Sequence, residues 1–210
     1  MSEKCQELHA LFRKLKRYQF PFNEKEIPQN GIYILFEKGE QAHGGDRIVR
    51  IGTHTGKNKL GSRLKEHFTN ENKDRSIFRK NIGRALLNRK SDDYLKIWEL
   101  DLISSENKQK YGHLINKNYQ QKIEHEVTKT IQNNFSFVVI EEGDKDKRLY
   151  LEAKLISDVS NCTECRSSKR WLGNYSIKEK IRGSGLWQEQ GVYKTGFTES
   201  EFANFIERYL

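Results

Sequence analysis

Apolar residues recur every three or four positions along much of this chain, which is the pattern of helices with one buried face. Leu60, Leu64 and Phe68 form the clearest stripe. Ser76 is placed to cap the next helix, and the TESE that starts the last helix has the spacing of a capping box. The pattern predicts helices over residues 5–17, 59–68, 76–89, 118–135, 149–161 and 198–210.

Other segments are short, β-branched or aromatic, and bounded by turn residues, as strands are. GIYILFE at residues 31–37 and RIVRIG at 47–52 flank a glycine-rich stretch and predict a hairpin with a long turn. FSFVVIEE at 135–142 predicts a buried strand. DDYLKIWELDLI at 92–103 alternates apolar and polar residues and is also expected to be a strand.

The irregular mixture of strands and helices after a leading hairpin predicts an α+β fold, a sheet domain carrying additional helices. A length of 210 residues suits a single core. No internal repeat or low-complexity segment divides the chain. We therefore expect one domain with appendages.

Composition indicates the kind of partner. Lys and Arg number 38 against 29 Asp and Glu, a formal net charge of +9, which favours nucleic acid first and anionic membrane second. No apolar run approaches the roughly 20 residues that span a bilayer, and the first residues lack the apolar core of a secretory signal. Three cysteines fit a reducing compartment. We expect a cytoplasmic protein with no membrane partner.

One acidic residue interrupts an apolar helical stripe. Leu149, Ile156 and Val159 recur on one face, and Glu152 occupies a position between them. A carboxylate in such a stripe is costly to desolvate, so it should meet a cation, a metal or a hydrogen-bond donor. The alternative is that Glu152 lies at the edge of the stripe and reaches solvent or pairs with an arginine.

Arg63 and His67 lie four positions apart and project from one face of the helix expected over residues 59–68. A guanidinium beside an imidazole can hold a phosphodiester, because the first neutralises charge on the phosphoryl oxygens while the second moves a proton. The alternative is an ordinary solvated helix face.

Cys162 and Cys165 form CTEC, a spacing that suits zinc or redox chemistry. Zinc needs two further ligands, and Cys5 and several histidines are available, none at a convincing spacing. The alternative is a pair of reduced thiols in a loop.

Taken in order, these pieces resemble the GIY-YIG nuclease superfamily. GIY stands on the first strand, an x-I-G ends the second, an R-x-x-x-H helix follows, and a later helix carries an inward glutamate. The segments RIGTHTG, LGSRLKEHF and SIFRKNIG also look like a prokaryotic subgroup in which R-I-G-T-H is a variant of the second motif. The resemblance covers most of the chain, from Gly31 to about Asn174.

The resemblance implies a small three-stranded antiparallel sheet flanked by helices, with extra helices and room for an extra strand. It divides the chain into an N-terminal helix and linker at residues 1–30 and a nuclease domain with inserted helices at 31–175. Residues 176–210 form a C-terminal loop and helix packed on the same domain.

The resemblance also implies a divalent-metal phosphodiesterase site. Tyr33 matches the tyrosine of the first motif, Arg63 the catalytic arginine, and His67 the residue one helical turn later. Glu152 matches the single acidic metal ligand, which would bind Mg²⁺ or Mn²⁺.

At two positions the match to the family leaves the site residue open: the asparagine and the general base. The family places an asparagine after the last of these helices, and Asn161 and Asn174 compete for that role; RWLGNYS looks ordered, which favours Asn174. The second motif has Arg50 where a tyrosine is usual, and arginine cannot act as a base. Either Tyr33 serves as the base, His54 takes over that role, or the site is degenerate.

We therefore expect a divalent-metal-dependent endonuclease that hydrolyses DNA phosphodiester bonds, without excluding RNA. The residues expected to grip the nucleic-acid backbone, rather than only to keep the surface soluble, are Lys57, Lys59, Arg79, Lys80 and Arg84. The alternative function is a catalytically degenerate nucleic-acid-binding module with the same fold. Cutting both strands with one site would require a homodimer or two visits.

Overall fold

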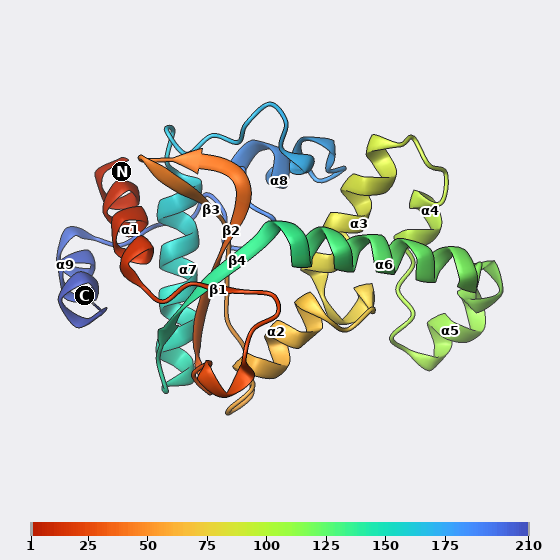
Figure 1. Ribbon diagram of the computed structural model, residues 1–210, viewed down its shortest axis with the longest axis horizontal. Helices are drawn as coiled ribbons and strands as arrows, with labels where there is room; N and C mark the ends of the chain where they lie inside the picture. Colours follow the sequence, from red (N-terminus) through yellow and green to blue (C-terminus); the bar gives the residue numbers. More distant parts are fainter. Residues whose placement is uncertain (1, 210) are drawn as a thin grey trace.

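Four antiparallel strands form one sheet, and helices cover both of its faces (Figure 1). The computed structural model describes residues 2–209. Within them the strand order is β1-β4-β2-β3. The strands are β1 (Tyr18–Gln19), β2 (Gly31–Ala42), β3 (Gly45–Gly52) and β4 (Phe135–Glu141).

The helices differ widely in length. Short 3₁₀ turns include η2 (Lys73–Arg75) and η4 (Leu172–Tyr175). The α-helices of the described residues are α1 (Ser2–Lys14), α2 (Leu60–Phe68), α3 (Ile77–Arg89), α4 (Leu95–Trp98), α5 (Ser105–Tyr111), α6 (Lys117–Asn134), α7 (Lys145–Ser160), α8 (Glu179–Ser184) and α9 (Glu199–Tyr209).

β2 lies inside the sheet because it pairs with β3 on one side and with β4 on the other. Its side chains alternate between two buried clusters: Ile32 and Ile34 point to one, and Tyr33 and Leu35 to the other. Burial on both faces explains why this strand is a continuous apolar run in the sequence.

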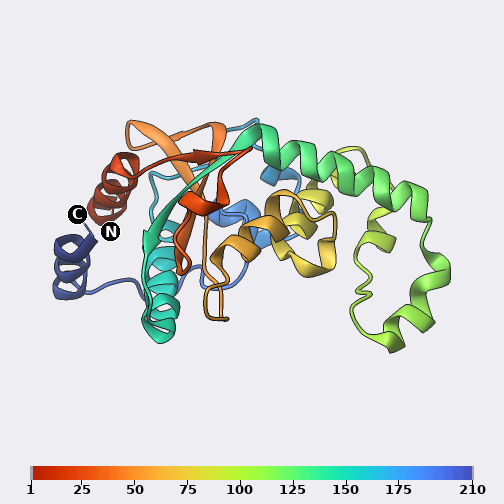
Figure 2. The same ribbon diagram turned by 60° about the horizontal axis from the view of Figure 1, so that its bottom comes forward.

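Helices α1, α7 and α9 cover the face of the sheet to which Ile34 points, and we call this the first face. Leu8, Leu155 and Phe205 are buried there. Helices α1 and α9, at the two ends of the described residues, lie side by side in both views (Figures 1 and 2).

Helices α2, α3 and α6 cover the second face, to which Tyr33 points, and bury Leu64, Phe78 and Val127. Helix α6 extends well beyond the sheet, and α4 and α5 lie around its far end (Figure 2). No helix within residues 2–209 combines the length and apolar character needed to cross a membrane.

The α+β class and most of the predicted elements are confirmed. The six expected helices are α1, α2, α3, α6, α7 and α9. Ser76 caps α3 by accepting the N–H of Arg79 at 3.2 Å, and Thr198 and Glu201 exchange capping bonds of 2.7 and 3.3 Å. The expected hairpin is present, but β2 continues to Ala42, so its turn is shorter than predicted.

The strand expected over residues 92–103 is wrong. The segment contains α4, because Leu95 and Trp98, one helical turn apart, both pack inward. Trp98 lies against Gly83, where a Cβ would overlap the indole, and its Nε1 donates to the carbonyl of Lys80 at 2.9 Å. The fourth strand is β1, which comes from residues expected to be linker.

Candidate active site

The candidate active site lies where the end of β3, the loop after it, and helices α2 and α7 meet. Tyr33 of β2 pairs with Gly52, the last residue of β3. A Cβ at position 52 would overlap the Tyr33 hydroxyl, so only glycine allows the phenol to lie across the end of β3. The first two sequence motifs are therefore in direct contact.

Tyr33 begins a chain of three hydrogen-bonded side chains, none more than 1 % exposed. Its hydroxyl lies 2.8 Å from Nε2 of His67, and Nδ1 of His67 lies 2.7 Å from Oγ of Ser76. Ser76 is also the N-cap of α3, where its Oγ accepts the backbone N–H of Arg79. The helix cap is thus part of the site.

His67 is held in its neutral form. Burial lowers its pKa well below the usual value, and the positive charges of Arg63, Arg50 and Arg79 lower it further. At physiological pH the imidazole therefore carries one proton and one lone pair.

Arg63 lies one helical turn before His67 on α2. Its Nη1 donates to Oε2 of Glu66 at 2.8 Å and to the carbonyl of Arg75 at 3.1 Å. Burial lowers the pKa of Arg63, but the neighbouring Tyr33 and Glu66 more than compensate and raise it overall. The guanidinium is therefore a fixed positive charge beside the Tyr33 phenol.

Arg50 extends from β3 into the same cluster and is 6 % exposed. Its Nη1 donates to the carbonyl of Trp187 at 2.5 Å, and its guanidinium lies 5.3 Å from the centre of the Phe78 ring. Its Nε has no hydrogen-bond partner among the described residues. Besides the effects of burial, its charge lowers the pKa of both His67 and Glu152.

Glu152 is half-buried on α7 and faces the end of β3. Its Oε1 accepts the backbone N–H of Thr53 at 3.0 Å. Burial raises its pKa, and Arg50, the Thr53 N–H and Arg63 partly counter this. The carboxylate borders two adjoining hollows, one lined in part by Arg63 and the other by Arg50.

The surroundings of Glu152 fit a hard divalent cation. Its Oε2 accepts no hydrogen bond from the described residues, and the two hollows give water ligands access to it. Mg²⁺ keeps several of its waters and is commonly bound by only one or two carboxylates. A single glutamate at a solvent-accessible hollow therefore suits this ion.

The sequence model of the GIY-YIG domain matches residues 3–210, nearly the whole chain. This chain belongs to the GIY-YIG domain family. Membership indicates nuclease activity, and GIY-YIG nucleases act on DNA and generally use divalent metals. No curated protein and no solved structure gives a significant match to the chain.

His54 follows the second GIY-YIG motif, and the backbone engages both of its ring nitrogens. Nδ1 lies 2.6 Å from the carbonyl of Gly56, and Nε2 accepts the N–H of Gly31 at 3.3 Å. Burial lowers the pKa of His54. The imidazole therefore fastens the loop after β3 to the start of β2, and its Nε2 lone pair is already used.

Neither candidate asparagine hydrogen-bonds to a side chain of this site within residues 2–209. Asn174, in η4, donates to the carbonyls of Ser168 at 2.9 Å and Lys169 at 3.2 Å and braces the loop before it. Asn161 follows α7 and donates to the carbonyl of Lys194 at 2.9 Å. The structure therefore does not bring an asparagine from either position to Glu152.

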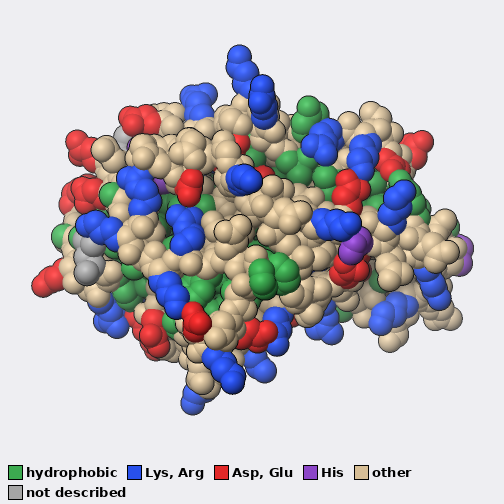
Figure 3. All heavy atoms as spheres, viewed as in Figure 1, with side chains coloured by type: hydrophobic (Ala, Val, Ile, Leu, Met, Phe, Trp, Pro, Cys, Tyr) green, Lys and Arg blue, Asp and Glu red, His purple; other side chains and the backbone are tan. Residues whose placement is uncertain are grey.

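The five basic residues expected on DNA separate into two groups. Lys57 and Lys59 are exposed on the loop between β3 and α2, and Lys59 borders one of the two hollows. Arg79, Lys80 and Arg84 point into the protein instead. On the face shown in Figure 3, basic side chains are scattered among acidic ones rather than gathered in one stripe.

Internal partners account for the second group. Arg79 is fully buried, and its Nη2 lies 2.8 Å from Oε2 of Glu124. Lys80 donates to the carbonyl of Glu99 at 2.9 Å, and Arg84 donates to the carboxylate of Glu99 at 2.5 Å. The face of α3 that was expected to contact the DNA backbone is instead covered by α6 and the segment around α4.

Sequence reasoning missed three contacts of the site. Ser76 was identified as a helix cap but not as the partner of His67. The N–H of Thr53 directly follows the glycine of the second motif, so its place beside Glu152 was available from the motif order. The Trp187 carbonyl comes from the C-terminal segment, where no motif signals it.

Proposed function

We propose that this GIY-YIG protein is a divalent-metal-dependent endonuclease that hydrolyses DNA phosphodiester bonds. The observation that carries the proposal is a convergence of groups at the end of β3. One carboxylate borders the hollows, two arginines lie near it, and a tyrosine–histidine pair adjoins them; these residues are Glu152, Arg50, Arg63, Tyr33 and His67.

Glu152 would hold Mg²⁺ or Mn²⁺ through a carboxylate oxygen, with water completing the coordination. The bound cation would neutralise charge on the phosphate and on the departing 3′ oxygen. Because burial raises the pKa of Glu152, protons compete with the cation at low pH, and the site gains its ligand as the pH rises.

Tyr33 is the proposed acceptor of the proton from the attacking water. Since Ser76 Oγ already accepts a backbone N–H, its own proton can point to Nδ1 of His67, which leaves the imidazole proton on Nε2 facing Tyr33. The N–H donated by His67 and the guanidinium of Arg63 both lie beside the phenol oxygen. As the phenolate, this oxygen would take one proton from the attacking water and become a phenol.

Arg50 and Arg63 are the proposed stabilisers of the extra negative charge on the phosphate in the transition state. Both guanidiniums are held in place by hydrogen bonds to neighbouring groups, so little reorganisation is needed when the charge develops. Lys57 and Lys59, on the exposed loop beside the hollow, would attract the DNA backbone.

The second candidate function is a nucleic-acid-binding module without catalysis. The observation that favours it is Arg50, a permanent cation at a position where the family motif has a tyrosine. This function predicts salt-sensitive DNA binding and no cleavage in either metal.

One experiment separates the two functions. The protein is incubated with supercoiled plasmid and end-labelled duplexes in Mg²⁺, in Mn²⁺ and in EDTA. A nuclease nicks or cuts only with metal, and Glu152→Ala abolishes this while DNA binding persists. Wild-type protein that binds and never cuts would support the binding module, and cleavage by Glu152→Ala at the wild-type rate would contradict the site.

A further inference from the structure

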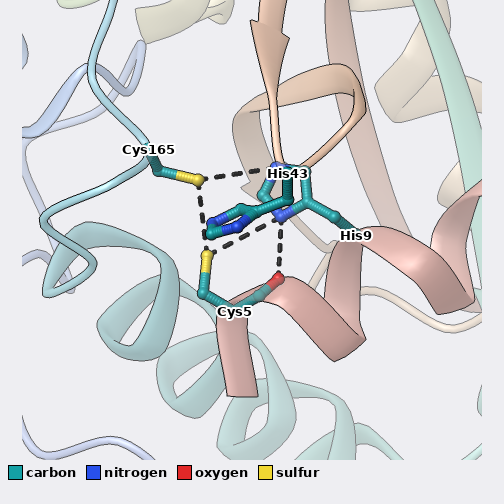
Figure 4. A group of neighbouring side chains, drawn as sticks. All are labelled: Cys5, His9, His43 and Cys165. Carbon is teal, nitrogen blue, oxygen red and sulfur yellow. Dashed lines mark hydrogen bonds between the residues drawn. The ribbon is translucent and has the colours of Figure 1, made fainter. Parts of the chain in front are cut away.

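Four side chains of the types that bind soft metals meet on the first face of the sheet (Figure 4). Cys5 and His9 lie four positions apart on α1, His43 lies in the turn between β2 and β3, and Cys165 follows α7. One nitrogen or sulfur atom from each lies within 4.8 Å of all the others. Figure 4 shows the four side chains directed toward one another.

The separations are those of a metal's ligand shell. Sγ of Cys5 lies 3.4 Å from Sγ of Cys165. Sγ of Cys165 lies 3.6 Å from Nε2 of His9. Ligands bound tetrahedrally to Zn²⁺ at ordinary Zn–S and Zn–N lengths lie about 3.3–3.8 Å from one another.

A backbone carbonyl orients the imidazole of His9. Its Nδ1 lies 2.8 Å from the Cys5 carbonyl, and donation to it leaves Nε2 for a metal. That Nε2 accepts the N–H of Ile48 at 3.2 Å, a contact that a metal would replace. A carbonyl partner of this kind accompanies zinc-bound histidines. Nδ1 of His43 lies 3.8 Å from a carboxylate oxygen of Glu164, beyond hydrogen-bond distance.

The cluster is closed to solvent. Cys5 and His9 are 0 % exposed, Cys165 is 4 % exposed and the His43 side chain 3 %. A metal ion at their centre would be shielded from bulk water, as the ion in a structural site is.

We propose that a structural Zn²⁺ is held by the four side chains Cys5, His9, His43 and Cys165. Two thiolates balance the charge of the ion, and two sulfurs with two nitrogens in a tetrahedron are a donor set that selects zinc. Four protein ligands leave no open position, so the ion cross-links α1, the hairpin turn and the segment after α7 rather than taking part in hydrolysis.

The proposal changes the ligand set expected from CTEC. Cys165 contributes its sulfur, but its sequence partner Cys162 does not belong to the group of four. Sγ of Cys162 lies 3.4 Å from Nε2 of His43, beside the cluster. The remaining ligands come from α1 and the turn, far away along the chain.

The test measures metal in the untagged full chain, purified under reducing conditions without added zinc. Inductively coupled plasma mass spectrometry should find about one zinc per chain. Reconstitution of the metal-free chain with Co²⁺ should give the ligand-field bands of a tetrahedral ion and thiolate-to-cobalt charge-transfer absorption. The spectrum reads the ligand set directly and does not depend on any variant folding.

Substitutions then assign the ligands. Cys5→Ser, Cys165→Ser and His43→Asn should each lose most of the zinc, and asparagine is chosen because position 43 has a φ of 49°, which it tolerates. Cys162→Ser should keep the metal, as should the exposed-histidine control, His113→Asn.

Three outcomes would overturn the proposal. The first is a wild-type chain without stoichiometric zinc that binds Co²⁺ in no tetrahedral thiolate site. The second is a Cys5–Cys165 disulfide, found by mass spectrometry of the protein under the same conditions. The third is Cys162→Ser losing zinc as completely as Cys165→Ser, which would show a different ligand set.

Discussion

The β2–β3 hairpin carries a polar cluster at each of its ends, and the two are built differently. At the Gly31 and Gly52 end, Glu152 presents an oxygen to two hollows while its neighbours are fixed by hydrogen bonds. At the turn, beside His43, four nitrogen and sulfur atoms converge on one another out of reach of solvent. An accessible oxygen ligand suits an exchangeable Mg²⁺, whereas a closed sulfur and nitrogen shell suits a permanent Zn²⁺.

Because of this difference, substitutions in the two clusters should affect different properties, the cleavage rate in one case and the stability of the fold in the other. Removing the Glu152 carboxylate from the open cluster should change the rate of cleavage and leave the fold intact, because the two hollows let solvent replace it. A ligand removed from the closed cluster should weaken the fold, because nothing can fill its place.

The largest effect is expected at Glu152. Glu152→Gln should lower the cleavage rate by about 1000-fold or more, equivalent to about 4 kcal/mol, because the metal loses its carboxylate. The melting temperature should hold or rise, since a carboxyl whose pKa is raised by burial is disfavoured as an anion in the folded state.

Glu142 provides the matched control, because it is a buried glutamate whose Oε2 accepts from Tyr209 at 2.6 Å and Arg208 at 3.1 Å on the first face. Glu142→Gln should lose roughly 1 kcal/mol of stability and keep its cleavage rate. If both variants lost cleavage equally, Glu152 would have no special role.

The next effect concerns the closed cluster. Removing zinc with a chelator under reducing conditions should lower the free energy of unfolding by about 3–4 kcal/mol, comparable to losing a native cross-link. Denaturant unfolding before and after chelation measures this, and added Mg²⁺ should not restore the loss. Before chelation, Cys5→Ser should already have the lower free energy of unfolding of the metal-free wild type, and the chelator should not change it further. A chelator effect as large in this variant as in the wild type would contradict the site.

Tyr33→Phe should slow cleavage by about 100-fold because the hydroxyl is lost while the ring still packs against Gly52. It should also cost about 1–3 kcal/mol of stability, because the buried Nε2 of His67 loses its hydrogen-bond partner. Single-turnover rates on a nicked-plasmid assay measure the first effect. His54→Gln should slow the reaction much less, since that imidazole bonds only to backbone groups. A larger loss in His54→Gln than in Tyr33→Phe would reverse the assignment of the base.

His67 should make stability depend on pH. Its pKa is lowered in the folded state, so below the ordinary value of about 6.5 the unfolded chain binds a proton that the folded chain does not. Stability should therefore fall as the pH drops below 6.5, by up to about 1.4 kcal/mol per pH unit. Unfolding of wild type and His67→Gln between pH 5 and 8 isolates this contribution, and a constant difference between them would contradict it.

The smallest effect is expected from the exposed loop. Replacing Lys57 and Lys59 together by alanine should weaken DNA binding by roughly three- to tenfold at low salt and make its salt dependence shallower. The same change at Lys108 and Lys110, exposed on α5, is the control for net charge. Equal losses in the two double variants would mean that only overall charge matters.

The sequence predicted local structure well, because periodicity and caps are local. The GIY strand, the stripe of α2 and the Ser76 cap all lie within one element, and burial of one face decides each of them. The order of the motifs assigned Tyr33 and His67 to one site, and the two side chains are in contact. The resemblance to the family supplied this long-range information, which no local pattern contains.

Contacts between distant segments escaped prediction for the same reason. Arg79 looked solvated, but Glu124 of α6 lies against it and buries both charges. Trp98 looked like part of a strand, and only its packing against Gly83 makes the helical turn favourable. The sulfur of Cys5 likewise lies against that of Cys165, and no local pattern around Cys5 predicts a contact with so distant a residue.

The separation of Cys5 from Cys165 by 160 positions has a consequence for how the chain is made. During translation, α1 emerges with two donor atoms already paired on one of its faces, and the turn at His43 soon adds a third. The fourth arrives only after the central strands and α7 have left the ribosome. The first helix therefore docks permanently only when most of the domain exists, so an incomplete chain carries a partly formed metal site until its last ligand is synthesised.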